Sequence, residues 1–395
     1  MNKSPWPCYT QEEIDAVTRI LRSNKVNYWT GEESQLFEKE FAKAQATKHA
    51  IALNNGTSAL EISLKAVGVG TNDQVIVSPR SFFASASAIV AVGAVPLFVD
   101  VDPDSQNLCP NKVEAAITPR CKAIIAVHLG GWPCDMDPLL DLAKTHKLYL
   151  IEDCAQAHGA LYKGRPVGSI GDVAAWSFCQ DKIITTGGEG GMITCQDTDL
   201  FKRIWSLKDH GKDWDVVQKT NKDLGFRWLH SNFGTNARMT EMQAAIGRIQ
   251  LRRLEDMQQK RARNAQNLKE IFTPFSQTEG PLRLPHYHYK SEKDSGLSRH
   301  AWYRFTAFVR SENFPKGLNR DTVIKRLNDK GLFCQQGICP EIYQEAAFEE
   351  HPGRPKERLN AARMLGETSL TFLTHPGLDY RSFMGQGFDL AEIFE

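Results

Sequence analysis

The chain has 395 residues, of which 41% are hydrophobic and 24% are charged. This composition is typical of a folded globular protein and excludes low-complexity disorder and collagen-like repeats. Lysine and arginine number 48 and aspartate and glutamate 47, which leaves a formal net charge of +1. A balanced charge gives no general reason to expect DNA, RNA or an anionic membrane as a partner. At about 100–200 residues per domain, the length indicates two or three domains, or one large domain with an appendage.

The sequence shows no sign of a membrane segment or a metal centre. No apolar run approaches the ~18–20 residues that span a bilayer. The first seven residues lack the apolar core of a signal peptide, so we expect a cytoplasmic protein. The nine cysteines are scattered, without a CxxC pair or a Cys/His cluster at zinc spacing. This pattern is typical of reduced structural thiols and predicts no metal site.

Between residues 54 and 195 the sequence alternates short apolar runs with helical stretches. Strands that are separated by helices and apolar on both faces indicate a mainly parallel sheet, covered by helices on both sides. The predicted fold class is therefore α/β. The expected helices lie over 82–92 and 137–146, and the expected strands are 75–77, 96–99, 123–129, 148–151, 173–178 and 191–195.

The character of the chain changes after Arg238. The pattern predicts one long helix over 239–271. A strand at 303–309 and helices over 320–330 and 359–365 follow. This order is typical of a smaller α+β domain. We place the boundary near residue 250, so that residues 1–250 form the large domain and residues 251–395 the small one.

The first candidate site is the run Asn55-Gly56-Thr57-Ser58, which lies between an apolar stretch and a helical pattern. A Gly-hydroxyl turn that opens a helix offers free N–H groups, hydroxyl donors and a favourable dipole, which suit a phosphate. Threonine and serine are also common at helix starts for reasons of capping alone. The turn by itself therefore leaves both a phosphate site and a simple helix start open.

Two further segments follow strands, and ligands of such sheets bind at the carboxyl ends of the strands. Asp153 follows directly after a clearly predicted apolar strand. A carboxylate at that position either contacts a ligand or has a structural role. Lys182 follows the next strand. After it comes Gly187-Gly188-Glu189-Gly190-Gly191, a run that indicates tight backbone packing beside a site. Each segment alone is also compatible with a structural or surface role.

Taken together, the three segments fit the chemistry of pyridoxal phosphate (PLP). This cofactor needs a lysine for covalent attachment, a carboxylate for its pyridine nitrogen and a hydroxyl-rich cup for its phosphate. A carboxylate beside the ring nitrogen raises the pKa of that nitrogen and keeps it protonated. The protonated ring is the electron sink that makes a neighbouring C–H bond acidic.

The combined motifs resemble the DegT/StrS family of sugar aminotransferases, which are fold type I PLP enzymes. In chain order the motifs are NGTSAL, EDCAQAHG, SFCQDK with GGEGG, and GTNARMTEMQAAIG. The resemblance extends from about Trp29 to Pro376. It implies a large domain with a mainly parallel sheet of the seven-stranded type, PLP as the cofactor, and a homodimer with shared active sites.

The resemblance also implies roles for individual residues. Lys182 matches the lysine that is bonded to the cofactor, and Asp153 matches the carboxylate of the pyridine nitrogen; these are the two expected catalytic residues. His158 lies in a family motif, without a role of its own. The other expected cofactor-binding residues are Gly56, Thr57 and Ser58 in the phosphate turn, Ser177 as a second phosphate hydroxyl, Phe82 stacked on the ring, Gln156 near the ring hydroxyl, and Asn236 in a segment that reaches the neighbouring subunit's site.

The expected substrate contacts are Trp29, Thr30, Arg80, His230 and Arg238, and residues 1–30 are expected to pack near the substrate cleft. Trp29 and Thr30 are equally compatible with packing of the N-terminal segment, and His230 with a solvated position. Arg80 departs from the family, where an uncharged residue is common just before the ring-stacking segment. Two interpretations of Arg80 stay open, a substrate contact and a solvated side chain.

The resemblance implies transfer of an amino group from glutamate to a nucleotide-linked keto-sugar, for amino-sugar and surface-polysaccharide biosynthesis such as that of lipopolysaccharide O-antigen. We expect UDP and a 3- or 4-keto group. A dehydratase branch of the fold has histidine in place of the lysine, so Lys182 favours transamination. Two alternatives remain, a PLP-dependent sugar dehydratase or lyase and a non-catalytic sensing or scaffold protein. The intact set of Lys182, Asp153 and Ser177 argues against the scaffold.

Overall fold

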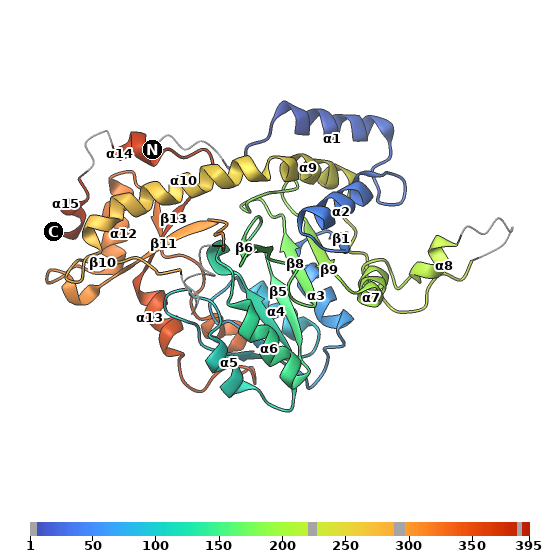
Figure 1. Cartoon of the computed structure of the whole chain (residues 1–395), viewed down its shortest axis with the longest axis horizontal. Coiled ribbons are helices and arrows are strands. Elements are labelled where there is room, and N and C mark those ends of the chain that lie inside the picture. The colour runs from blue at the N-terminus through green and yellow to red at the C-terminus, as the bar shows by residue number, and fades with distance from the viewer. Residues whose placement is uncertain (1–5, 220–226, 288–296, 385–388) are drawn as a thin grey trace.

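A seven-stranded mixed sheet organises the first half of the chain (Figure 1). The structure, a computed structural model, describes residues 6–219, 227–287, 297–384 and 389–395. The pairs β3–β2, β2–β4, β4–β5 and β5–β8 are parallel, whereas β9 is antiparallel to both β8 and β1. This topology confirms the predicted mainly parallel α/β class. In sheet order the strands are β1 (His49–Leu53), β9 (Gly191–Cys195), β8 (Val173–Ser177), β5 (Tyr149–Asp153), β4 (Cys121–Val127), β2 (Gln74–Val77) and β3 (Val95–Phe98).

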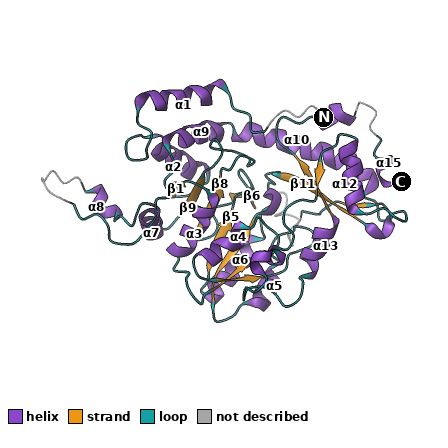
Figure 2. Cartoon of the chain, turned by 180° about the vertical axis from the view of Figure 1, so that it is seen from behind, coloured by secondary structure: helices purple, strands orange, loops and turns teal. Residues whose placement is uncertain are grey.

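Helices cover both faces of this sheet. Successive residues of a strand point to opposite sides, and in the central strands both sets are apolar and need to be buried. In β4, Ile124 packs into one apolar cluster and Ile125 into another. The strands lie among these helices in the view from behind as well (Figure 2). The first cluster includes residues of α2 (Glu33–Ala44), α5 (Pro110–Ala116) and α6 (Met136–His146), and the second includes residues of α3 (Gly56–Ala66), α4 (Ala84–Ala91) and α7 (Thr198–Lys208).

A second, four-stranded antiparallel sheet of order β10-β11-β13-β12 lies in the last third of the chain. Its apolar face packs on α10, where the ring of Phe272 lies 4.9 Å from that of Phe372. The strands are β10 (Leu282–Arg283), β11 (Arg304–Val309), β12 (Cys334–Gln335) and β13 (Ser369–Leu373), and the surrounding helices are α10 (Leu254–Phe272), α12 (Arg320–Asp329), α13 (Asn360–Thr368), α14 (Tyr380–Met384) and α15 (Ala391–Phe394).

Two consecutive helices replace the single long helix expected over 239–271. α9 (Glu241–Arg252) begins at a capping box between Thr240 and Gln243, and α10 follows it almost in line (Figure 1). The break falls at Arg253, whose N–H is shared between the carbonyls of Ile249 and Gln250. A shared donor of this kind is typical of a helix end. The expected domain boundary, residue 250, lies within α9.

The remaining elements lie at the periphery of the two sheets. The short helix α8 projects away from the body of the molecule (Figure 1). Among the described residues, no helix combines the length and the apolar character needed to cross a membrane. The peripheral elements are α1 (Gln11–Ser23), α8 (Trp214–Gln218), and the hairpin of β6 (Leu161–Tyr162) and β7 (Arg165–Pro166).

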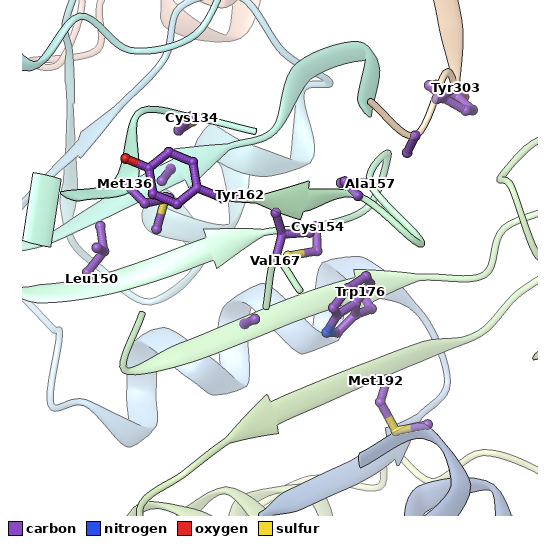
Figure 3. Close-up of a cluster of buried hydrophobic side chains, with 14 of the residues drawn as sticks. Cys134, Met136, Leu150, Cys154, Ala157, Tyr162, Val167, Trp176, Met192 and Tyr303 are labelled. Carbon is purple, nitrogen blue, oxygen red and sulfur yellow. The ribbon is translucent and has the colours of Figure 1, made fainter. Parts of the chain in front are cut away.

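The core below β5 and β8 is close-packed around Trp176, which lies near Cys154 and Val167 (Figure 3). Gly168 has a positive φ of 82°, and a Cβ placed on it would come within 2.2 Å of the Trp176 ring. The Trp176 indole N–H donates to Thr194 Oγ1 at 3.0 Å, so the ring is held in place by a hydrogen bond as well as by packing. This contact requires glycine at residue 168.

Gly168→Ala is therefore expected to lower the free energy of unfolding by about 2–4 kcal/mol, from overpacking added to the cost of a left-handed backbone. Gly164→Ala is the matched control, because Gly164 has a similar φ of 79° and nothing within 4 Å of its Cβ position. The control is expected to lose only the backbone share, about 1–2 kcal/mol. Urea unfolding curves of both variants measure the difference, and equal losses would contradict the packing argument.

Candidate active site

A cavity of about 590 Å³ opens at the carboxyl ends of β4, β5 and β8. Its walls come from both sheets, since Thr306 and Thr371 of the small sheet line it together with Asp153 and Ser177 of the large one. The sequence predicted the large-sheet side of this cavity. Most of the predicted cofactor residues line it, namely Gly56, Thr57, Phe82, Asp153, Gln156, Ser177 and Lys182.

Lys182 lies just beyond the end of β8 and points its ammonium group into a polar network. Its Nζ lies 3.4 Å from the hydroxyl of Tyr303 and 3.3 Å from Oδ1 of Asp181. Burial by itself lowers the pKa of Lys182. The nearby Tyr303 and Asp181 outweigh that effect, and the pKa is raised above its ordinary value. These neighbours therefore favour the protonated form of Lys182.

Sequence reasoning missed the network around Lys182, in which Tyr303 and Asp181 contact its Nζ and Arg304 contacts Asp181. The Tyr303 hydroxyl donates to Asp181, and Arg304 lies 3.4 Å from the same carboxylate. Tyr303 and Arg304 belong to the small-sheet region, more than a hundred residues along the chain. In the sequence, Asp181 was noted only as the residue that precedes Lys182, and nothing indicated a role for it. The sequence contains no local signal for this pairing, because folding alone brings the two segments together.

The N-terminal segment supplies a further contact. The indole N–H of Trp6 donates to the backbone carbonyl of Lys182 at 3.1 Å. The Trp6 ring stacks on His375, with ring centroids 5.9 Å apart, and the guanidinium of Arg261 lies 5.0 Å from its centroid. Part of the segment expected near the cleft thus holds the lysine loop.

Asp153 is the last residue of β5 and is buried. Oδ2 accepts a hydrogen bond from the hydroxyl of Ser85 at 2.8 Å, and Oδ1 accepts one from the N–H of Ala155 at 3.1 Å. Burial raises the pKa of the Asp153 carboxyl, although these two hydrogen bonds act in the opposite direction. A carboxylate in such a place gains from a cationic partner, since the partner removes the cost of its buried charge.

The turn at the start of α3 forms a cup against the end of β8. A Cβ on Gly56 would come within 2.7 Å of the Ser177 Cβ, so only glycine allows this approach. Thr57 and Ser177 both line the cavity with hydroxyl-bearing side chains. Ser58 does not line it, and its N–H donates to the side chain of Asn55 at 2.8 Å, which caps the helix. The helix start is thus confirmed by the Asn55 cap, and the phosphate site stays a prediction for Thr57 and Ser177.

Two further predicted cofactor contacts, Phe82 and Gln156, also line the cavity. Phe82 is 63% exposed and lines the cavity with its ring. Gln156 is buried, and its Oε1 accepts a hydrogen bond from the N–H of Gly130 at 2.7 Å. His158 does not line the cavity; it packs between Trp176 and Phe178, and burial lowers its pKa to about 3, so it is neutral. His158 is a core residue.

Five predicted residues lie away from this chain's own cavity. Asn236 and His230 are exposed on the segment that precedes α9. Arg238 pairs with Asp209 at 2.8 Å. Trp29 packs edge-on against Trp205 with ring centroids 5.9 Å apart, and Thr30 lies in the adjoining exposed turn. The structure of a single chain thus does not bring these residues together with Lys182.

Arg80 lies in the cavity wall and is only 1% exposed. This burial excludes the solvated interpretation. Nε donates to Oε1 of Gln106 at 3.1 Å, whereas NH1 has no hydrogen-bond partner among the described residues. Burial lowers the pKa of Arg80 to about 10, which still leaves it charged near neutral pH.

One group of side chains within the described ranges has the spacing of metal ligands, namely His128, Glu152 and Cys154, all buried. The Glu152 carboxylate already accepts hydrogen bonds from His128 and from the N–H groups of Gly168 and Ile170. These bonds use both oxygens for the fold. We therefore assign the group to the support of β5.

The residues of the cavity fit PLP. A buried carboxylate without a cation of its own, a lysine in the same cavity and a glycine-hydroxyl cup are the three features that the cofactor needs. Asp153 would face the pyridine nitrogen, Lys182 would bond the aldehyde carbon, and Thr57 with Ser177 would hold the phosphate. Such a set supports amino-group transfer, since it joins an anchoring lysine to a site that protonates the ring.

Comparisons with known proteins extend over nearly the whole chain. A family model described as the DegT/DnrJ/EryC1/StrS aminotransferase family matches residues 7–382. The GDP-perosamine synthase of Caulobacter vibrioides is 39% identical over 344 residues, which are 87% of this chain and 85% of that protein. The spore coat polysaccharide biosynthesis protein SpsC of Bacillus subtilis is 40% identical over 324 residues, 82% of this chain and 79% of that protein. The X-ray structure of an aminotransferase from Psychrobacter cryohalolentis has a TM-score of 0.93 at 51% identity and covers 96% of each chain.

Proposed function

The chain belongs to the DegT/DnrJ/EryC1/StrS aminotransferase family, and on that premise we propose that it moves an amino group from L-glutamate to a nucleotide-linked keto-sugar. Members of this family are PLP-dependent sugar aminotransferases. The name of one relative, GDP-perosamine synthase, supports a nucleotide-sugar product, and the name of SpsC supports a role in surface-polysaccharide synthesis. UDP and a 3- or 4-keto group remain our prediction for the acceptor. A screen of UDP-, GDP- and dTDP-linked keto-sugars tests it.

The observation that carries the proposal is the common location of Lys182 and Asp153. Both line one cavity at the ends of the neighbouring strands β8 and β5; burial raises the pKa of Asp153, and the charge of Lys182 acts in the opposite direction. A surface lysine and a structural aspartate have no reason to share a cavity. The same pairing disfavours the scaffold alternative, because a scaffold gains nothing from a buried carboxylate whose pKa is raised by burial.

When bound, PLP supplies a covalent attachment point for amino groups and an electron sink that acidifies the adjacent C–H bond. Asp153 would face the ring nitrogen of the cofactor, and Ser85 orients that carboxylate. Lys182 would accept and return a proton at its Nζ. Tyr303 and Asp181 keep this Nζ within reach, and Trp6 fixes the lysine backbone. The cavity walls from both sheets orient the donor and exclude water.

We also propose a homodimer in which Asn236 and Arg238 reach the partner's cavity, with Trp29, Thr30 and His230 beside them. Support comes from their position away from their own chain's cavity and from exposed aromatic side chains on the segment that carries His230 and Asn236. Phe233 is 96% exposed and precedes Asn236 by three residues. Exposed aromatic side chains of this kind indicate an interface.

Lys182→Ala is expected to abolish the visible absorbance of the lysine-linked cofactor and to lower turnover by at least about 10³-fold, because the proton carrier is lost. An absorbance spectrum before and after addition of L-glutamate measures both the attachment and the first half-reaction. Lys65→Ala is the matched control, since Lys65 is exposed on α3. A variant that kept the visible band would remove Lys182 from this role.

Asp153→Asn preserves the size of the side chain and removes its charge. The amide cannot stabilise a protonated ring nitrogen, so we expect single-turnover rates with L-glutamate to fall by about 10²- to 10³-fold while the unfolding temperature stays close to that of the wild type. Rapid-mixing absorbance and thermal unfolding measure the two quantities. Near-normal rates would show that another carboxylate faces the ring.

Mixing Lys182→Ala chains with Asn236→Ala chains tests the shared site directly. If Asn236 serves the partner's cavity, a mixed dimer contains one site with both native residues, and random pairing restores about a quarter of the wild-type activity. If Asn236 serves its own chain, no mixture regains activity. The measurement is turnover after co-refolding or subunit exchange, with each variant alone as the baseline.

A further inference from the structure

We propose that Arg80 forms a carboxylate-binding subsite in the cavity wall, which pairs with a carboxylate of a substrate of the proposed transamination. The inference rests on that function for the identity of the substrate, but the binding site itself is argued from the cavity. The carboxylate belongs either to the amino donor or to the sugar. Both sources share the same chemistry, and the experiment separates them.

Arg80 differs from the other cations of the cavity in having no carboxylate beside it. Lys182 and Arg304 share the carboxylate of Asp181, at 3.3 and 3.4 Å. Of the two other lining carboxylates, Asp153 accepts a hydrogen bond from Ser85 and Glu189 lies beside Cys179. Within the described ranges no ion pair within 4.0 Å involves Arg80, and its one side-chain partner is the neutral amide of Gln106. A buried charge without a counterion is costly, so an anionic ligand gains from pairing with it.

The guanidinium is held in a fixed position by groups that leave part of its donor fork free. Oε1 of Gln106 accepts the hydrogen bond from Nε of Arg80. The backbone of Gln106 has a positive φ of 65°, and its N–H donates to the carbonyl of Asp102 at 2.9 Å in a turn that fixes this conformation. The backbone of Arg80 is pinned by the hydroxyl of Ser78, which accepts from the Arg80 N–H and donates to the Arg80 carbonyl, both at 3.1 Å. NH1 remains without a partner. A pre-positioned fork with free N–H groups matches the geometry of a carboxylate.

The small domain closes over this position. The N–H of Ile342 donates to the carbonyl of Pro79 at 2.8 Å, which ties the Arg80 segment to the chain that follows β12. Gln335, the last residue of β12, and Gly337 just after it line the same cavity. Arg80 therefore lies between the cofactor side of the cavity and the small domain. A carboxylate bound there would be a part of the substrate some distance from the reacting carbon.

The test uses the PLP-loaded full chain and glutarate, a dicarboxylate without an amino group, as the binding probe. We expect glutarate to raise the unfolding temperature of the wild type, and we expect Arg80→Met to bind it about 10- to 100-fold more weakly. Arg80→Lys keeps the charge but loses the fork, and it is expected to bind with intermediate strength. Arg120→Met, at an exposed position in the turn before β4, is the matched control and should bind like the wild type.

Two kinetic arms identify the source of the carboxylate. In the donor arm, the KM for L-glutamate is measured in the first half-reaction. In the acceptor arm, a UDP-linked keto-uronate is compared with the matched neutral keto-hexose. A 10- to 100-fold rise of KM in Arg80→Met, with kcat changed far less, assigns the carboxylate to the arm in which it occurs. Either result supports the subsite.

A purely structural role makes the opposite prediction. If Arg80 is only structural, ligand-free Arg80→Met has a lower unfolding temperature, but its affinity for glutarate and both KM values are those of the wild type. This result overturns the proposal. If Arg80→Met fails to fold, Arg80→Lys decides by the same criteria. Failure of the proposed function is distinguishable, because a wild type without transamination still reports on Arg80 through the glutarate titration.

Discussion

The parallel pairing of β5 with β8 is the constraint on which the rest of the site depends. In its register Asp153 lies opposite Ala175, two residues before Ser177. The Asp153 carboxylate, the Ser177 hydroxyl and the loop that carries Lys182 therefore lie together at the carboxyl ends of the strands. Hydrogen bonds between parallel strands fix this register over the whole strand. Asp153 and Ser177 are therefore placed by strand backbone, whereas Lys182 lies on the loop that follows β8.

The buried carboxylate of Glu152 stabilises the pairing of β5 with β8 by hydrogen bonds. Glu152 precedes Asp153 and accepts hydrogen bonds from His128 and from the N–H groups of Gly168, Ile170 and Gly171, which join β5 to the residues that lead into β8. Burial by itself raises the pKa of Glu152, but these donors outweigh it, and the pKa is held below its ordinary value. Two consecutive acidic residues thus have opposite roles, one for the fold and one for the cavity, because they point to opposite faces of the strand.

The region of the second sheet contributes to the cavity at two places. Tyr303 and Arg304 meet Asp181 beside the lysine, while the chain after β12 is bonded to the segment that carries Arg80. A ligand that touches both the lysine and Arg80 would therefore lie beside residues of both sheet regions. This arrangement makes the remote parts of a substrate useful for positioning its reacting carbon.

The sequence by itself determined the sheet class and the turn at Gly56, because both depend on local spacing: apolar runs that end in a polar residue, and a glycine-hydroxyl turn at a helix start. It placed Asp153 and Lys182 beyond the ends of two strands, and their expected roles came from the combined motifs and the family resemblance. It predicted a continuous helix where Arg253 interrupts one, since the periodicity does not register a single shared hydrogen bond. Only the tertiary structure decided that Arg80 is buried, that Tyr303 reaches Lys182, and that Trp29 and Asn236 lie away from their own cavity. These facts depend on contacts between segments far apart in the chain, which no local pattern of residues encodes.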